Sequence, residues 1–164
     1  MIPPAPPLKL PARELIAAYG ADAPKLRAAI SGLSQADLIA RPIAGKWSTL
    51  EVVIHLADAE VAFADRVKRI LAMDEPQLLA WHENKFIERL HYHDQSAEDA
   101  VKLVEAVRAN TKRILDKASD ADLQRRGIHN DRGPQTVTDV LSYCVWHLNH
   151  HLSFVAEKRK ALGK

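Results

Sequence analysis

Apolar residues recur every three or four positions in two long stretches of the chain, with charged residues such as Lys102, Glu105 and Arg108 elsewhere on the helical wheel. This spacing places each apolar set along one face of an α-helix. No segment shows the sustained alternation of a strand, so the pattern predicts amphipathic helices. The first set is Val101, Val104, Val107, Thr111, Ile114 and Leu115, and the second is Val137, Leu141, Cys144, Leu148, His151 and Val155.

Helix-start signals and helix breakers divide the chain into segments. Ser48-Thr-Leu-Glu51 has the spacing of a capping box, and similar hydroxyl and acid pairs begin at Ser96 and Thr136. We predict four main helices, the first of which is kinked or broken at Pro24. Helices of this length favour an all-α fold, a four-helix bundle. The approximate ranges are 12–31, 48–74, 97–118 and 136–161.

Two of the segments outside these helices have a distinctive composition. Five of the nine prolines lie within residues 1–11, which favours a flexible, solvated arm and leaves residues 12–164 as the bundle domain. Residues 75–96 form a long connection. Long ordered loops often carry functional residues, although this one could simply cap the bundle. Its aromatic and histidine side chains are Trp81, His82, Phe86, His91, Tyr92 and His93.

Composition narrows the function. The chain has 164 residues, and 23 Lys and Arg against 21 Asp and Glu leave a net charge of +2, without the basic patch of a nucleic-acid binder. A single cysteine cannot form an internal disulfide and the N-terminus has no apolar signal segment, so we expect a cytoplasmic protein. The longest uncharged stretch, residues 140–156, contains three histidines and is a poor membrane span.

The eight histidines indicate metal chemistry, because imidazole is the commonest metal ligand. His147 and His151 stand four residues apart on or beside the apolar stripe, so they can point at one ion. His150 lies to the side and should be more exposed. The alternative is that each of the two is a core histidine bonded to a backbone carbonyl or a facing hydroxyl.

His55, in the predicted helix 48–74, would supply a third nitrogen. On the helical wheel it lies at the edge of the apolar sector, on the side of Glu51 and Asp58, where a side chain can line a cavity open to solvent. Three neutral histidines with an open position form the arrangement of catalytic zinc sites. Glu51 and Asp58 are candidates for carboxylates that orient metal-bound histidines; the alternative is a solvated helix face.

The other candidates favour structural roles. We expect Cys144 to be a small buried hydrophobe rather than a fourth ligand. Trp47 precedes a helix start and fits a hydrophobic staple or a plug between helices better than a substrate platform. Trp146 projects away from the two histidines of its helix. The remaining histidines lie in or near predicted loops and should be exposed, although the last two named could reach the mouth of the site: His82, His129, His91 and His93.

Two motifs resemble a known family. They are the run RPIAGKWS at residues 41–48 leading into HLADAE at 55–60, and WHLNHH at 146–151. In this order they resemble the DinB-like superfamily, in particular its YfiT-type members, over nearly the whole chain after the proline arm. The resemblance implies a four-helix bundle that holds a divalent metal on His55, His147 and His151. We expect this metal to be Zn²⁺ or Ni²⁺. It also implies a homodimer.

The resemblance implies an activity as well. Members with known activity are metal-dependent thiol S-transferases that use bacillithiol, mycothiol or glutathione, or related isomerases, and many others carry only the label of metal-dependent hydrolase. We favour a transferase in which a small-molecule thiol attacks an electrophile as thiolate. A second hypothesis is a hydrolase with metal-bound hydroxide as nucleophile and Asp58 or Glu51 as base. A third is a non-catalytic bundle whose metal fixes the fold or the dimer, or whose histidines bind nothing.

Overall fold

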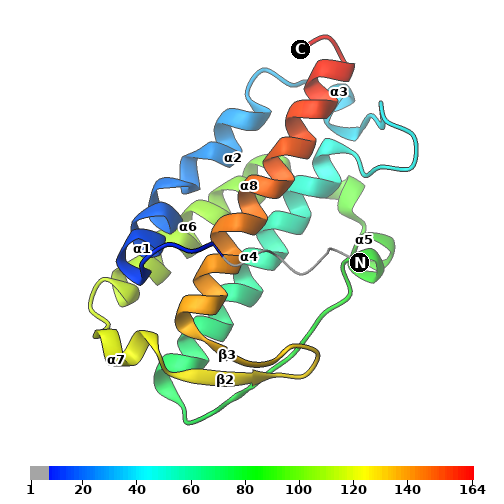
Figure 1. Cartoon of the computed structure of the whole chain (residues 1–164). Helices are drawn as coiled ribbons and strands as arrows, with labels where there is room; N and C mark the ends of the chain where they lie inside the picture. The colour runs from blue at the N-terminus through cyan, green and yellow to red at the C-terminus, as the bar shows by residue number, and fades with distance from the viewer. Residues whose placement is uncertain (1–7) are drawn as a thin grey trace.

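The computed structural model describes residues 8–164, and helices dominate this part of the chain (Figure 1). α4 packs against α6 and α8, and the α1 and α2 pair packs against the same two helices from the other side. The predicted four-helix bundle is therefore confirmed, with one of its sides made of two consecutive helices. The bundle elements are α1 (Ala12–Ala21), α2 (Ala23–Ile30), α4 (Thr49–Ala72), α6 (Ala97–Leu115) and α8 (Val137–Ala161).

Short helices occupy the connections. The long connection after α4 holds α5 and the 3₁₀ turn η1, and the other two short helices flank the bundle ends. These elements are too short for the apolar periodicity that predicts the long helices. Their bounds are α3 (Gln35–Ile39), α5 (Glu83–Arg89), η1 (Tyr92–Asp94) and α7 (Asp120–Leu123).

Side-chain caps start the long helices where the sequence predicts. Ser48 and Glu51 form a complete capping box at the start of α4, and Thr136 begins α8 in the same way. The break in the first helix lies at Asp22 rather than at Pro24. Pro24 instead occupies the first turn of α2, where the absence of a backbone NH removes no helical hydrogen bond.

A small three-stranded sheet, which the sequence did not predict, lies at the end of the molecule opposite the C-terminus (Figure 1). β1 (Gln77–Leu78) pairs in parallel with β2 (Arg126–His129), and β2 pairs antiparallel with β3 (Gly133–Thr136). Strands this short show no alternation in the sequence. Gly127 is needed for the close approach, because a Cβ there would lie 2.9 Å from the carbonyl oxygen of Pro76. β3 leads directly into α8 and so fixes where that helix begins.

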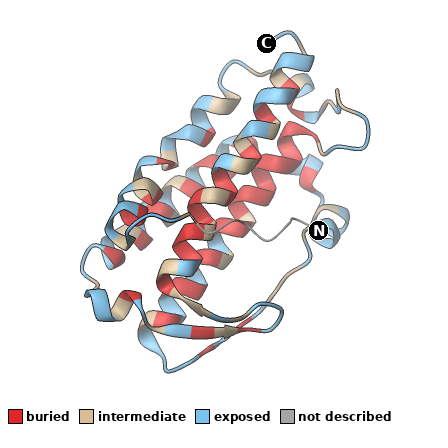
Figure 2. Ribbon diagram, in the orientation of Figure 1, coloured by how far each residue is buried: buried red, intermediate tan, exposed pale blue. Residues whose placement is uncertain are grey.

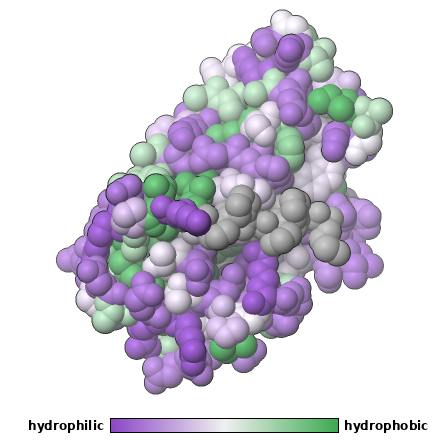
Figure 3. Space-filling view, viewed as in Figure 1, coloured by the Kyte–Doolittle hydropathy of each residue, from purple (hydrophilic) through white to green (hydrophobic). Residues whose placement is uncertain are grey.

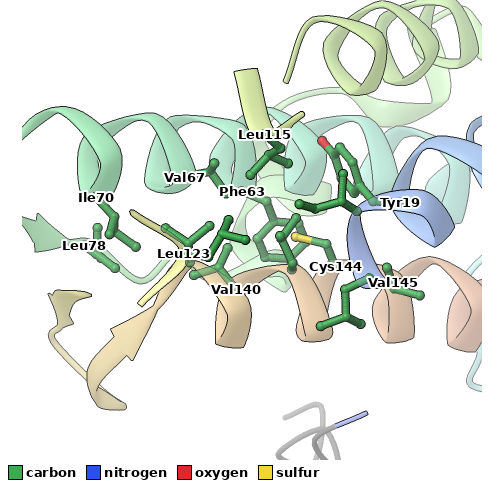
Figure 4. Packing of buried hydrophobic residues seen from close by; sticks show 14 of the residues in the cluster. Tyr19, Phe63, Val67, Ile70, Leu78, Leu115, Leu123, Val140, Cys144 and Val145 are labelled. Carbon is green, nitrogen blue, oxygen red and sulfur yellow. The ribbon is translucent and has the colours of Figure 1, made fainter. Parts of the chain in front are cut away.

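The interior contains two apolar clusters, and buried residues concentrate along α4 and α8 (Figure 2). The first cluster extends to the sheet and includes Phe63 and Leu141, and the second extends to α2 and includes Leu26 and Val155. Cys144 lies among the apolar side chains of the first cluster (Figure 4). Burial raises the pKa of its thiol. Cys144 is thus a buried hydrophobe, as predicted.

The proposed arm over residues 1–11 falls mostly outside the described residues. Leu8, the first residue described, donates its backbone NH to Ser142 Oγ at 2.8 Å and packs against the bundle. The face shown in Figure 3 is mostly hydrophilic, with hydrophobic side chains only in small patches. Of the helices in residues 8–164, none has a stretch long and apolar enough to cross a membrane.

Candidate metal centre

Three histidines from two helices converge inside the bundle. His55 lies on α4, His147 and His151 lie on α8, and each is at most 3% exposed. Their candidate ligand nitrogens all lie within 4.8 Å of one another, and the Nε2 atoms of His55 and His147 are 3.1 Å apart. Residues four apart on a helix share one face, so α8 presents two nitrogens to the one from α4. The structure brings together all three histidines that the sequence predicts.

Three ring nitrogens of the triad lack the protein partners that a purely structural histidine would have. His55 Nδ1 and both ring nitrogens of His151 are buried without a hydrogen bond. An unsatisfied buried polar group costs about 1–3 kcal/mol. Because neither ring nitrogen of His151 has a hydrogen-bond partner, this residue is not a core histidine bonded to a carbonyl or a hydroxyl.

The spacing of the nitrogens fits a metal ion. Bonds of about 2.0–2.1 Å at tetrahedral angles place two zinc-bound nitrogens roughly 3.3 Å apart. The 3.1 Å separation of the Nε2 atoms of His55 and His147 is close to this value. A triad of imidazoles therefore has both the chemistry and the spacing to hold a first-row divalent ion.

Burial keeps the three imidazoles neutral. Loss of solvation lowers the pKa of His55 to about 4. Loss of solvation, followed by the neighbouring imidazoles and Lys158, lowers the pKa of His151 to about 3. Loss of solvation, followed by the neighbouring imidazoles and Arg108, holds the pKa of His147 well below its usual value. Because only a neutral imidazole has a free lone pair, all three are ready to act as ligands near neutral pH.

Two tryptophans wall the triad. The Trp47 ring lies parallel to His151, at an interplanar angle of 3° and a centroid distance of 6.1 Å, and its centroid is 5.1 Å from that of His55. Trp81, from the connection after α4, stacks on His55 at 5.3 Å. Trp47 packs against the apolar core, as a residue between helices would, and it also contacts two histidines of the triad, which the sequence did not indicate. No helical periodicity could have found either residue, because both precede helices rather than lie within them.

A pocket of about 190 Å³ opens beside His151. Its apolar walls include Trp47 and Phe154, and charged side chains line it as well. A second pocket, of about 280 Å³, shares Lys46 and Trp47 with the first and extends to Arg41. Concave sites with apolar walls and a few polar groups are typical of small-molecule binding. The charged residues of the first pocket are Lys46, Glu83, Glu157 and Lys158.

The two candidate carboxylates have partners away from the triad. Glu51 accepts the backbone NH of Ser48 at 2.6 Å and pairs with Arg41. Burial by itself raises the pKa of Glu51, but Arg41 and Ser48 together outweigh it and hold that pKa below its usual value. Asp58 accepts the hydroxyl of Tyr92. Within residues 8–164, neither carboxylate hydrogen-bonds to a ring nitrogen of the triad.

Two predictions about burial on α4 are corrected. His55 does not lie at a half-exposed border but is 1% exposed, and Glu51, one turn earlier, is also buried. Every residue from Thr49 to Ala57 is buried, because other elements cover this half of α4 on all sides. A helical wheel shows which face of a helix is the more apolar, but it does not show whether other elements also cover the polar face.

The remaining histidines lie outside the triad. His150 is half-buried and stacks on Trp146 at 4.5 Å, to the side of the site as expected. His93 lies 3.4 Å from a carboxylate oxygen of Glu51 rather than beside the triad. His129 was expected to be exposed but is buried in β2, a strand that the sequence did not predict.

The family model of the DinB superfamily matches residues 19–155, and the chain belongs to this superfamily. A relative from Geobacillus thermodenitrificans, named "Putative metal-dependent hydrolase", is 28% identical over 92% of this chain and 85% of its own length. A Bacillus subtilis relative named "Putative metal-dependent hydrolase YfiT" is 24% identical over 85% of this chain and 79% of its own.

Two solved structures share the architecture. One is described by the words "YfiT from Bacillus subtilis is a probable metal-dependent hydrolase with an unusual four-helix bundle topology"; its TM-score is 0.87 at 22% identity, covering 99% of this chain and 94% of that one. The other, a mycothiol-dependent maleylpyruvate isomerase, has a TM-score of 0.66 at 13% identity, covering 91% of this chain and 60% of that one. Because the sequence identities are this low, both matches show similarity of fold alone.

Proposed function

We propose that His55, His147 and His151 bind one divalent first-row metal ion, Zn²⁺ or Ni²⁺. The observation that carries this proposal is the convergence of three neutral imidazoles, among which one nitrogen of His55 and both nitrogens of His151 are buried without a protein partner. The names of the relatives, which describe metal-dependent proteins, support it. Three protein nitrogens leave a coordination position open, as in catalytic rather than structural sites.

We further propose that the site transfers a small-molecule thiol to an electrophile. A bound divalent ion would supply Lewis acidity and favour the thiolate over the thiol near neutral pH. Trp47 and Trp81 pack against the triad, whose three histidines are buried. The pocket beside His151 receives the body of the substrate.

The placement of the carboxylates favours thiol transfer. Glu51 and Asp58 are held by Arg41 and Tyr92, away from the histidines. A thiol with a free pKa of about 8–9, lowered further by a bound divalent ion, would release its proton to solvent without a protein base, whereas hydrolysis that uses a general base needs that base within hydrogen-bond reach of water. The solved structure described as a mycothiol-dependent maleylpyruvate isomerase supports this proposal to the extent that a protein of similar fold depends on a thiol.

Hydrolysis at the same site is the second candidate. The names of the relatives favour it. Glu83 and Glu157 line the pocket beside His151, so either could serve as the general base in place of Glu51 or Asp58.

Elemental analysis tests the metal site. Protein purified without chelators or nickel resin should contain about one first-row ion per chain. His147→Ala should lose the ion, and His150→Ala, a neighbouring histidine outside the triad, should keep it. Wild-type protein that is metal-free and takes up neither zinc nor nickel on incubation would overturn both candidate activities.

A second assay separates the two activities. Metal-loaded protein is incubated with monochlorobimane and a panel of low-molecular-weight thiols, and separately with ester and amide substrates. Conjugate formation above the metal-free control supports thiol transfer. Turnover of esters or amides without thiol supports hydrolysis instead.

The homodimer stays a prediction. Size-exclusion chromatography with light scattering should give twice the chain mass of 18.3 kDa. A monomeric mass at micromolar concentration would refute it.

A further inference from the structure

The pocket beside His151 contains a buried cation that the proposed chemistry does not use. Lys158 is 3% exposed and lines this pocket together with His151. It lies two turns further along α8, a rise of about 10 Å, and therefore on the same face of the helix. Lysine is almost never fully buried unless it has a partner.

Lys158 has spare hydrogen-bonding capacity. Its Nζ donates to the carbonyl oxygen of Phe154 at 3.2 Å and lies 5.7 Å from the centre of the Phe154 ring. Within residues 8–164, no carboxylate lies within ion-pair distance of this ammonium group. An ammonium group has three donors, so two remain for a ligand.

The charges around Lys158 favour an anion. Lys46 lines the same pocket. Burial is the main cause that lowers the pKa of Lys158; the charge of Glu157 raises this pKa, that of Lys46 lowers it and that of Glu51, which is already paired with Arg41, raises it. Glu157 is exposed and Glu83 only half-buried, so their carboxylates keep contact with water. A desolvated charge interacts more strongly with a ligand than hydrated ones do, so Lys158 dominates the pocket.

We propose that Lys158 binds a carboxylate group of the substrate. The apolar part of that substrate would lie along Trp47 and Phe154, with its reacting group at the histidine triad. This inference rests on the proposed function for the reacting end. The subsite narrows the substrate to a small amphipathic molecule with a carboxylate at one end and the reacting atom at the other.

A matched pair of probes tests this subsite. ω-Mercaptohexanoate and ω-mercaptohexanamide share a thiol and an apolar chain and differ only in the negative charge. Binding to the cobalt-loaded protein is followed by the thiolate-to-cobalt absorption band, and binding to the metal-free protein by tryptophan fluorescence. We expect the acid to bind at least about tenfold more tightly than the amide, because only the acid forms a charge-assisted hydrogen bond with the ammonium group.

Three variants test whether Lys158 causes the preference for the acid over the amide. Lys158→Met should bring the two affinities within about twofold by weakening only the acid, since the bond to the carboxylate is lost. Lys158→Arg, which keeps the charge, should retain most of the preference. Lys160→Met, which removes an exposed lysine of the same helix, should leave it unchanged.

The outcomes separate the two proposals. A preference for the acid that survives Lys158→Met, or a variant that weakens both probes equally, overturns the subsite. Failure to load cobalt defeats the metal site alone, because the metal-free comparison still reports on Lys158. Equal binding of the two probes by wild-type protein in both states overturns the subsite independently of the metal.

Discussion

Two buried polar clusters lie near each other in the bundle and differ in one respect. In the first, Glu60 accepts hydrogen bonds from Tyr19 and from Arg108 Nε, the latter at 2.8 Å, and Arg108 also donates to the carbonyl of Tyr19. All three residues are at most 3% exposed, and the Arg108 guanidinium lies 4.6 Å from the centre of the Tyr19 ring. In the histidine triad, three nitrogens are buried without partners.

The difference separates a structural cluster from a functional one. Both clusters bury polar atoms, but the Glu60 cluster satisfies them with protein groups, and the triad leaves them for a ligand. Burial alone therefore does not mark a site. The convergence of several unpaired nitrogens on one point does, because single unpaired hydroxyls also occur in the interior, at Thr49 and Thr111, whereas a cluster of unpaired groups needs an explanation such as a bound ion.

The largest effect should come from breaking the satisfied cluster. Arg108→Met removes the cationic partner of Glu60 and leaves a buried carboxylate, so the free energy of unfolding should fall by about 3–5 kcal/mol. Urea denaturation measures it. Arg27→Met is the control, since Arg27 pairs with Glu98 and Glu105 on the surface. A variant at position 108 as stable as this control would show that the buried pair is not structural.

Filling the unsatisfied cluster should have the next largest effect. Zinc at a hundred times its dissociation constant should raise the free energy of unfolding of the wild-type protein by about 2.7 kcal/mol, because it binds the folded state. The measurement is the denaturation midpoint with and without zinc. His147→Ala should show no such gain, and His150→Ala should show all of it. An unchanged wild-type midpoint would contradict the inference that the unpaired nitrogens of the triad bind a metal ion.

Acid should weaken the metal-free protein through the triad. His55 has a pKa of about 4 in the folded state and near 6.5 when unfolded. Stability is therefore complete above about pH 6.5 and falls as pH drops toward 4, because only the unfolded state takes up the proton in that window. The expected slope is about 1.4 kcal/mol per pH unit for this histidine.

The matched comparison for this slope is His55→Leu. Unfolding free energies of the metal-free variant, measured between pH 6.5 and 4.5, should fall less steeply than those of wild type by the contribution of one histidine. Parallel pH profiles for the two proteins would show that His55 does not remain neutral in the folded state.

The smallest effect should have the opposite sign. His151→Leu replaces two unpaired buried nitrogens with a hydrocarbon, so the metal-free protein should gain about 1 kcal/mol of stability. Thermal unfolding in the presence of chelator measures it. His150→Leu, at a half-buried position, should change stability by less than about 0.5 kcal/mol. A clear loss of stability in His151→Leu would mean that its nitrogens are satisfied in the metal-free protein.

The long helices were predictable because their capping residues and the three- to four-residue spacing of their apolar residues indicate the same segments. The capping boxes at Ser48 and Thr136 fix two starts, and the stripe from Val137 to Val155 follows a buried face. The sheet was not predictable, since β1 has two residues and its pairing with β2 joins distant parts of the chain. Arg108 was assigned to the polar face of its helix, and only the opposing Glu60 explains its burial.

The histidine positions of the candidate site could be predicted, but their surroundings could not. The four-residue spacing of His147 and His151 reports a shared face, and the two motifs add His55. Trp47 and Trp81 reach the triad through loop conformation, which has no period to detect. Lys158 follows the same face as His151, yet a lysine near a helix C-terminus is usually a solvated one.

The stacking of Trp47 on His151 and of Trp81 on His55 makes the site optically observable. The third tryptophan, Trp146, stacks on His150, outside the triad. A paramagnetic ion such as Ni²⁺ or Co²⁺ held by the triad would quench the emission of the two adjacent indoles, whereas Zn²⁺, with its filled d shell, would not. Intrinsic fluorescence can therefore distinguish the metals that the ligand set alone does not, and follow their exchange in real time.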